Sequence, residues 1–430
     1  MNNTKCKVTR LTLVLVVGLL AKSAFAASPA VGIACTEGPT FNLEAKNGHI
    51  QMPDMNTMYM WSYAPAGGTF QHPGPILCVN EGDTVTVVLT NSLANYPNTT
   101  PTRASIMFPG QVNVQANGAL AQPDLANNSL TNSIAPGETV TYSFVANHPG
   151  TFIYESGTNT KMQVAMGMFG ALIVRPTGKP DQVYGNSNSQ FTPSEEFMAL
   201  LSEIDPYQHQ AVESNRAFNM NTYQARYWLI NGRGFPDSIA DNFAPWLPSQ
   251  PYGALARIHP YDKYLPDGTT LNPSPIHPLP GVERFINVGT EEFPFHPHAN
   301  NGLMIGRDGH PLEDSGQDLS MEKFAFNIGP GQTWDVIFKW HDAENYSPAN
   351  PVPVAVPDLV NQKLGMFYSG SPYLGVSETL PPGANTLNQC GEFYIISHNH
   401  ALFQLDSFGQ TMSGPVTYLR VDPPQPNTCP

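Results

Sequence analysis

Short apolar stretches separated by turn residues run along most of the chain, which lacks the long amphipathic runs of helical proteins. The 42 prolines and 36 glycines supply the turn signals between these stretches. This pattern is typical of an all-β protein. It predicts strands at residues 84–90, 139–145, 171–174, 227–230, 283–288, 333–340 and 393–396.

A stretch rich in Pro, Gly, Asn and Ser at 178–196 interrupts the strand pattern and predicts a linker. It separates an N-terminal domain at 27–177 from a C-terminal domain at 197–430. Each of these segments is long enough to form a β-sandwich with its own core.

The start of the chain has the layout of a secretory signal peptide at 1–26. Three cations precede the apolar run at 11–20, and Ala-Phe-Ala follows at 24–26. The apolar run is shorter than the roughly 20 residues of a membrane helix, so no membrane span is expected. We therefore expect an exported protein, either periplasmic or extracellular.

The charge balance argues against nucleic acid as a partner. Without the four cations of residues 1–26, 16 basic and 34 acidic residues remain, which gives a formal charge of −18. Such a surface repels nucleic acids and anionic membranes, and it favours solubility or a cationic partner.

Four cysteines lie beyond the predicted signal peptide: Cys35, Cys78, Cys390 and Cys429. An even number in an exported chain predicts two disulfides. Proximity along the chain favours Cys35 with Cys78 and Cys390 with Cys429, while the two other pairings stay open.

Two histidine pairs near the C-terminal end carry the main chemical signal: His296 with His298, and His398 with His400. Residues i and i+2 of an extended strand face the same side, so each pair presents two neighbouring imidazoles. Imidazole is a ligand for copper, zinc, iron and nickel. A single pair of this kind is more often two unrelated histidines, but two pairs in one half of the chain favour a metal site.

A set of short motifs occurs in a fixed order over nearly the whole chain beyond residue 26. They are PGPI at 73–76, EGD at 81–83, IAPGET at 134–139, GTFIY at 150–154, GMFGA at 167–171, INGR at 230–233 and IGPGQ at 328–332. Together they resemble the multicopper oxidase superfamily, including laccases and copper nitrite reductases. The resemblance implies two Greek-key cupredoxin-like β-sandwich domains, where a laccase has three.

The resemblance also implies which copper ligands are present. At the positions of the type 1 copper ligands this chain has Phe293, Asn399 and Gln404, none of which replaces the family's Cys and His residues. Of the family's three-copper cluster, the ligands of the last domain correspond to His296, His298, His398 and His400.

The cluster ligands of the first domain are missing from the sequence. The family's first His-x-His motif corresponds to MFPG at 107–110, and its second to YESG at 154–157. A complete eight-histidine cluster therefore cannot assemble, and we do not expect a standard laccase.

Three functions from different classes stay open. In the first, the four histidines, joined by Glu155 across a domain interface, hold copper for binding, storage or delivery. In the second, they form a mononuclear copper site that exchanges electrons with an outside partner. In the third, the chain is a metal-free scaffold that forms a homo-oligomer or a larger protein assembly, to which long loops at 346–363 and 371–389 would contribute.

Other candidates carry weaker signals. Met107, Met162, Met166 and Met168 form either a thioether patch for Cu(I) or part of a sandwich core. Five further histidines adjoin Pro or Gly and are expected on the surface or in loops. They are His72, His148, His259, His277 and His310.

Overall fold

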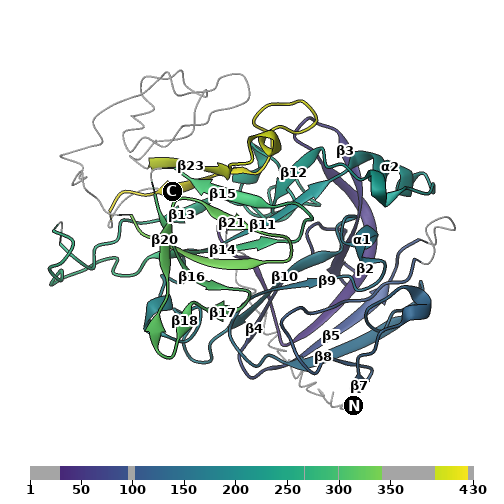
Figure 1. The fold of residues 1–430 in the computed structure, drawn as a ribbon, viewed down its shortest axis with the longest axis horizontal. Coiled ribbons are helices and arrows are strands. Elements are labelled where there is room, and N and C mark those ends of the chain that lie inside the picture. The colour runs from purple at the N-terminus through teal and green to yellow at the C-terminus, as the bar shows by residue number, and fades with distance from the viewer. Residues whose placement is uncertain (1–29, 95–101, 266, 299, 341–392, 425–430) are drawn as a thin grey trace, which may run out of the picture.

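The computed structural model describes residues 30–94, 102–265, 267–298, 300–340 and 393–424. Within these ranges the chain forms five β-sheets and a few short helices, which confirms the all-β prediction (Figure 1). The predicted signal peptide at 1–26, Cys390, Cys429 and the loops at 346–363 and 371–389 lie outside the described residues. No helix in the described part of the chain has the length and apolar character needed to cross a membrane.

The first sandwich consists of a six-stranded and a four-stranded sheet. The six-stranded sheet contains, in order across it, β3 (Thr57–Pro65), β2 (Thr40–Gln51), β5 (Thr84–Asn91), β8 (Thr139–Val145), β6 (Gln115–Ala116) and β7 (Ala119–Leu120). The four-stranded sheet contains β1 (Cys35–Glu37), β4 (Ile76–Asn80), β10 (Phe169–Arg175) and β9 (Gly150–Glu155). Trp61, Val87 and Leu172 belong to the apolar core of this sandwich.

The second sandwich consists of a seven-stranded and a five-stranded sheet. The seven-stranded sheet contains β12 (Tyr227–Ile230), β11 (Glu196–Ile204), β14 (Gly281–Asn287), β22 (Thr333–Phe338), β16 (Gly302–Arg307) and β17 (His310–Pro311), with β20 (Met321–Lys323) also paired to β16. The five-stranded sheet contains β13 (Ala256–Ile258), β24 (Val416–Val421), β23 (Phe393–Asn399), β15 (Phe293–Pro297) and β21 (Phe326–Ile328). A separate hairpin joins β18 (Glu313–Asp314) to β19 (Gln317–Asp318).

All seven predicted strands coincide with observed strands, and those at 139–145 and 227–230 match β8 and β12 residue for residue. In both sandwiches, strands far apart in the sequence are neighbours in space, as in the parallel pairs β2–β5 and β11–β14. Such crossovers are those of Greek-key sandwiches and agree with the expected cupredoxin-like fold.

Helices occur only as short connections between strands in the described residues. They are α1 (Thr160–Gln163), α2 (Pro206–Glu213), and the 3₁₀ turns η1 (Leu125–Asn127), η2 (Ser187–Ser189), η3 (Met220–Thr222), η4 (Asp237–Ile239) and η7 (Leu402–Leu405). The α2 helix begins after Asp205, whose side chain accepts hydrogen bonds from the backbone N–H groups of Tyr207 and Gln208.

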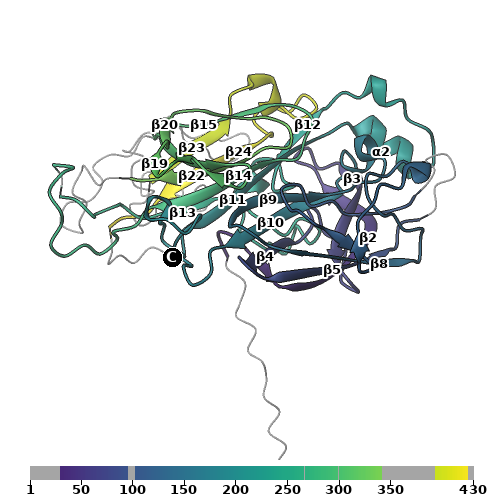
Figure 2. The same cartoon turned by 60° about the horizontal axis from the view of Figure 1, so that its bottom comes forward.

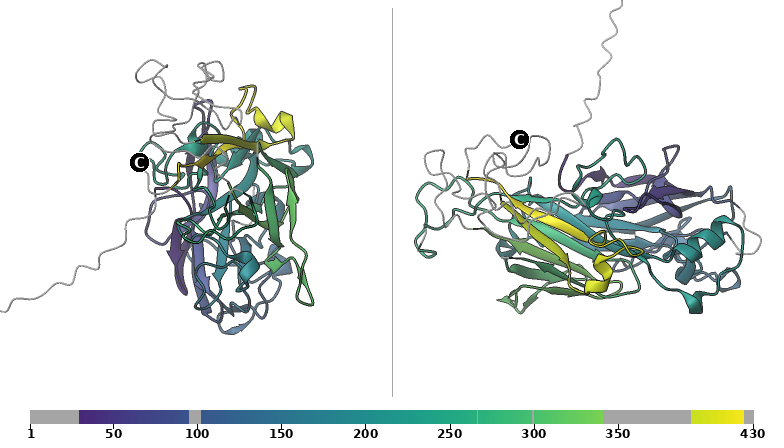
Figure 3. Two further views of the ribbon diagram at one scale, coloured as in Figure 1. Left: turned by 90° about the vertical axis from the view of Figure 1, so that its left-hand side faces the viewer. Right: turned by 90° about the horizontal axis from the view of Figure 1, so that it is seen from above.

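The two sandwiches pack face to face through their inner sheets (Figure 2; Figure 3, right). Apolar residues of β4 and β10 meet those of β11 and β14 in one buried cluster that includes Ile76, Ile173, Leu200 and Ile286. The molecule is therefore a stack of four sheets, in which the six-stranded and five-stranded sheets are outermost.

A buried ionic network crosses the same interface. Arg284 of β14 donates from Nε to Glu196 of β11 at 2.7 Å and from Nη1 to the Thr151 hydroxyl of β9 at 2.8 Å. Its Nη1 also lies 3.3 Å from Asp335, to which Thr151 donates at 2.5 Å. Arg175 of β10 pairs with the other oxygen of Glu196 at 2.7 Å. Charged groups thus join both sandwiches, with Arg284 fully buried and Arg175 partly exposed.

A disulfide joins Cys35 in β1 to Cys78 in β4, as proximity predicts. The predicted linker runs between β10 and β11, and β11 begins at its last residue, Glu196. Val183 and Phe191 of this segment are fully buried against the seven-stranded sheet. The segment therefore packs on the second sandwich along its course.

Candidate metal centre

The strands β15 and β23 bring the four predicted histidines together. In this antiparallel pair His296 lies directly opposite His398. The backbone N–H groups of His298 and His400 extend the ladder on either side, with hydrogen bonds of 2.9 and 2.7 Å. Because facing positions and their i+2 neighbours share one side of a sheet, all four side chains lie on the same face. Phe295, which alternates with the histidines, is buried in the core of the sandwich, so the histidine face is the outer one.

The four imidazole rings form a close cluster. The ring centroids of His296 lie 4.9, 5.7 and 5.2 Å from those of His298, His398 and His400. The Nε2 atoms of His298 and His398 face each other at 2.9 Å. Two imidazole nitrogens bound to one metal ion at about 2.0–2.1 Å lie about 3 Å apart, so this pair has the spacing of two ligands of one ion.

Backbone carbonyls fix the tautomers of two of these rings. His296 Nδ1 lies 2.5 Å from the carbonyl oxygen of Phe324, and His398 Nδ1 lies 2.9 Å from that of Asn399. A carbonyl oxygen only accepts, so each Nδ1 carries the proton and each neutral ring presents an unprotonated Nε2. Histidines that bind metals are oriented by such carbonyl acceptors in many proteins.

Burial keeps two of the rings neutral. The pKa of His398 is lowered to about 4, mainly by burial and also by the neighbouring histidines, against the opposing effect of the hydrogen bond to Asn399. Burial and the nearby His296 and His400 also lower the pKa of His298. His296 and His298 border an open hollow of about 400 Å³, whose rim includes Phe324. Neutral imidazoles beside an open hollow are the form in which histidine binds metal ions.

The three residues at the positions of the type 1 ligands lie on the other side of β15 and β23. Phe293 is buried in the core. The side-chain amide of Asn399 donates to Gln404, which donates in turn to Glu291 at 2.7 Å. Glu291 also accepts from the Trp228 indole at 2.9 Å. Side chains joined by hydrogen bonds thus fill the place that corresponds to the type 1 copper site.

The first sandwich contains residues 107–110 and 154–157, which correspond to the family's two first-domain histidine motifs. Met107 and Glu155 exchange backbone hydrogen bonds of 2.7 and 3.1 Å, and the Ser156 hydroxyl donates to Gln163 at 2.6 Å. A side chain at Gly157 would come within 2.8 Å of Met107 Cγ, so the space there is already filled. Burial raises the pKa of Glu155.

Two sequence-based predictions concern side chains of the first sandwich. Glu155 is the last residue of β9, and its role as a further ligand of the histidine site stays a prediction. Met162, Met166 and Met168 are buried in the core of the first sandwich, in agreement with their packing role.

His72, His148, His259 and His277 lie in loops, as expected, and His310 is exposed. Loop position does not mean exposure, because His72 is completely buried. His259 and His277 converge on the buried carboxylate of Glu195, at 2.5 and 2.9 Å from its Oε1. Each of these two histidines precedes a proline in a separate loop, so no local spacing could have revealed that they meet.

Comparison with known proteins agrees with this architecture. The family model described as multicopper oxidase matches residues 45–179. The L-ascorbate oxidase of Cucurbita pepo var. melopepo is 30% identical over 181 residues, which are 40% of this chain and 28% of the relative. The copper-containing nitrite reductase of Neisseria gonorrhoeae is 36% identical over 105 residues, which are 24% of this chain and 23% of the relative. Each of these two sequence matches thus spans less than a third of the relative's length.

Solved structures match over most of the chain. The multicopper oxidase mgLAC superposes with a TM-score of 0.57 at 18% identity, covering 89% of this chain and 86% of that one. The blue copper oxidase of Nitrosomonas europaea gives a TM-score of 0.55 at 18% identity, with coverages of 89% and 85%. The copper nitrite reductase of the same organism gives 0.51 at 18% identity, with coverages of 91% and 95%. These structures share the fold of this chain, within which residues 45–179 match the multicopper oxidase family model.

Proposed function

We propose that the chain is an exported copper-binding protein that holds copper on His296, His298, His398 and His400. The observation that carries this proposal is the shared outer face of β15 and β23, where four imidazoles cluster and two of them turn Nδ1 toward a backbone carbonyl oxygen. Nitrogen donors of this type suit copper. The named relatives include copper-containing enzymes, which favours copper among the metals that imidazole binds.

The proposal includes the absence of a laccase reaction. Reduction of oxygen to water by this superfamily needs an entry site for electrons and a cluster that stores them. Phe293, Asn399 and Gln404 offer no thiolate or imidazole for the first, and the filled space around Met107 and Gly157 offers none for the second. Bound copper would supply one-electron redox chemistry at the histidine face. The protein's own contribution is to hold neutral imidazoles in place on a rigid sheet.

Two other functions are outcomes of the same experiment. The rings are already satisfied in part by hydrogen bonds to each other and to backbone carbonyls, as in a metal-free scaffold. A mononuclear redox site would need an external electron partner at the open hollow. Metal binding distinguishes the metal-free scaffold from our proposal. Turnover with an added reductant distinguishes the mononuclear redox site from it.

The test is a competition titration of the copper-free protein with Cu(I) and Cu(II) against a chromophoric chelator. We expect the His296→Ala/His398→Ala variant to lose at least about tenfold in copper affinity, because loss of even an outer partner of a ligand costs about 10–100-fold. The matched control is His49→Ala/His310→Ala, which removes two imidazoles elsewhere and should leave the affinity unchanged. Equal affinity in the two double variants would refute the proposal, and no binding by the unaltered protein would favour the scaffold.

A further inference from the structure

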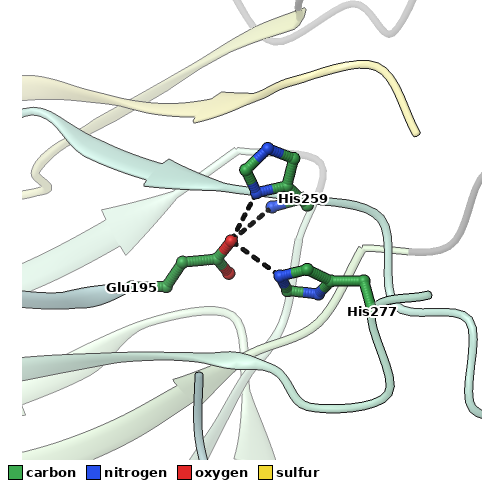
Figure 4. A group of neighbouring side chains, drawn as sticks. All are labelled: Glu195, His259 and His277. Carbon is green, nitrogen blue, oxygen red and sulfur yellow. Dashed lines mark hydrogen bonds and ion pairs between the residues drawn. The ribbon is translucent and has the colours of Figure 1, made fainter. Parts of the chain in front are cut away.

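A second group of potential metal ligands lies at the end of the second sandwich. Glu195 directly precedes β11, His259 directly follows β13, and His277 lies in the loop before β14. Their side chains converge from three separate segments (Figure 4). Glu195 Oε1 lies 2.5 Å from His259 Nδ1 and 2.9 Å from His277 Nε2. One possible ligand atom from each of the three residues lies within 4.8 Å of the other two.

The carboxylate at the centre of this group is almost completely buried. The Glu195 side chain is 2% exposed, and its second oxygen, Oε2, has no hydrogen-bond partner among the residues that the structure describes. An oxygen of a buried carboxylate without a donor is costly, and a cation offsets that cost. The two histidines are 18% and 13% exposed, so an ion from solvent can reach the group.

The surroundings hold both histidines in place. The carboxylate of Asp262 accepts hydrogen bonds from the backbone N–H groups of Ile276 and His277, at 2.6 and 2.7 Å, and so fixes the loop that carries His277. Behind His259, the buried Asp422 lies with Oδ2 3.7 Å from Nε2. A metal bound at Nδ1 requires the proton of this ring at Nε2, where Asp422 faces it. Carboxylates commonly orient metal-binding histidines from this position.

We propose that Glu195, His259 and His277 form a second metal site for a divalent transition-metal ion such as Zn²⁺. Two imidazoles and one carboxylate are a donor set typical of zinc with one position left to solvent. Ligand atoms at about 2.0–2.2 Å from zinc lie about 3–3.5 Å apart, so the group reaches that geometry by small side-chain shifts. The bound ion ties the segment that enters β11 to the loops that follow β13 and precede β14.

The site is tested in a His296→Ala/His398→Ala background, which removes two ligands of the copper site proposed above. We expect this protein to bind one Zn²⁺ per chain in equilibrium dialysis, and its thermal midpoint to rise on addition of Zn²⁺. Adding His277→Ala or, separately, Glu195→Gln should lower the zinc affinity at least about tenfold and abolish the rise of the thermal midpoint. Loss of even an outer partner of a metal ligand costs about 10–100-fold in affinity, so loss of a ligand itself costs at least as much.

The matched control is His49→Ala in the same background. His49 pairs with Glu213 at 2.8 Å on the surface but has no second imidazole in that pair, and both side chains are about half exposed. Zinc binding should be unchanged in this control. No zinc bound by the background protein, or binding that survives His277→Ala, would overturn the proposal and leave the group as two histidines paired with one glutamate. His277 lies in a loop, so its variant tests the site even if Glu195→Gln fails to fold.

Discussion

Replacing Arg284 by Met tests whether the buried ionic network holds the two sandwiches together. The Arg284 side chain has no exposed surface, and those of Glu196 and Asp335 are 5% and 1% exposed. Methionine keeps the length of the side chain but removes the charge and the donors. Loss of one partner from a buried ionic group costs about 3–5 kcal/mol, because the remaining charges stay buried. Loss of two charge-assisted hydrogen bonds, at about 1.5–3 kcal/mol each, leads to the same range.

The assay is urea unfolding followed by far-ultraviolet circular dichroism, with Arg307→Met as the matched control. Arg307 pairs with Asp308 at 3.1 Å, but these side chains are 44% and 48% exposed, so the control should lose about 1 kcal/mol or less. Circular dichroism is preferred to tryptophan fluorescence because Arg307 lies over the Trp334 ring. A loss in Arg284→Met no larger than that in the control would refute the reasoning.

Acid should reduce the difference between the Arg284→Met variant and the unaltered protein. Burial alone would raise the pKa of Glu196, but Arg284 and Arg175 lower it below its ordinary value of 4.5. The network's contribution is therefore present above pH 4.5 and is lost as the pH falls through the lower pKa of the folded protein. Unfolding free energies measured at pH 7 and pH 3 check this direction.

Three further predictions concern buried groups outside the network. Burial raises the pKa of Glu283 to about 8, so the folded chain keeps a proton that the unfolded chain releases above pH 4.5. The free energy of unfolding should therefore fall between pH 4.5 and pH 8, by up to about 1.4 kcal/mol per pH unit. Glu283→Gln should remove this pH dependence in urea unfolding. Burial and His209 lower the pKa of His72 to about 3, so stability should fall as the pH drops from 6.5 to 3, and His72→Phe should weaken this fall in acid titrations. The Cys35→Ser/Cys78→Ser variant should lose about 4 kcal/mol of unfolding free energy, because the disulfide closes a loop of 43 residues and so restricts the unfolded chain. A loss below about 1 kcal/mol in thermal or urea unfolding would contradict this value.

The sequence allowed the strands and one shared histidine face to be predicted because both depend on local spacing. Alternation at i and i+2 places His296 beside His298 whatever the rest of the fold does. The direct pairing of His296 with His398 could not be predicted, because it depends on the register between strands about 100 residues apart in the chain.

The group around Glu195 could not be predicted for the same reason. His259 and His277 lie in separate loops, and their approach to Glu195 depends on how β13 and β14 are placed by their partner strands. Glu283 shows another limit. It faces the apolar core in register with Phe197 and Val336, although its charge would predict an exposed position.

The central claim, that copper binds the histidine face of β15 and β23, is tested most directly by metal analysis of the protein purified after native export without added copper. Mass spectrometry of the unaltered protein should find near-stoichiometric copper, with no blue absorption from a copper–thiolate bond, and the His296→Ala/His398→Ala variant should have lost it. Copper retained in that variant, or no copper in the correctly folded unaltered protein, would contradict the account.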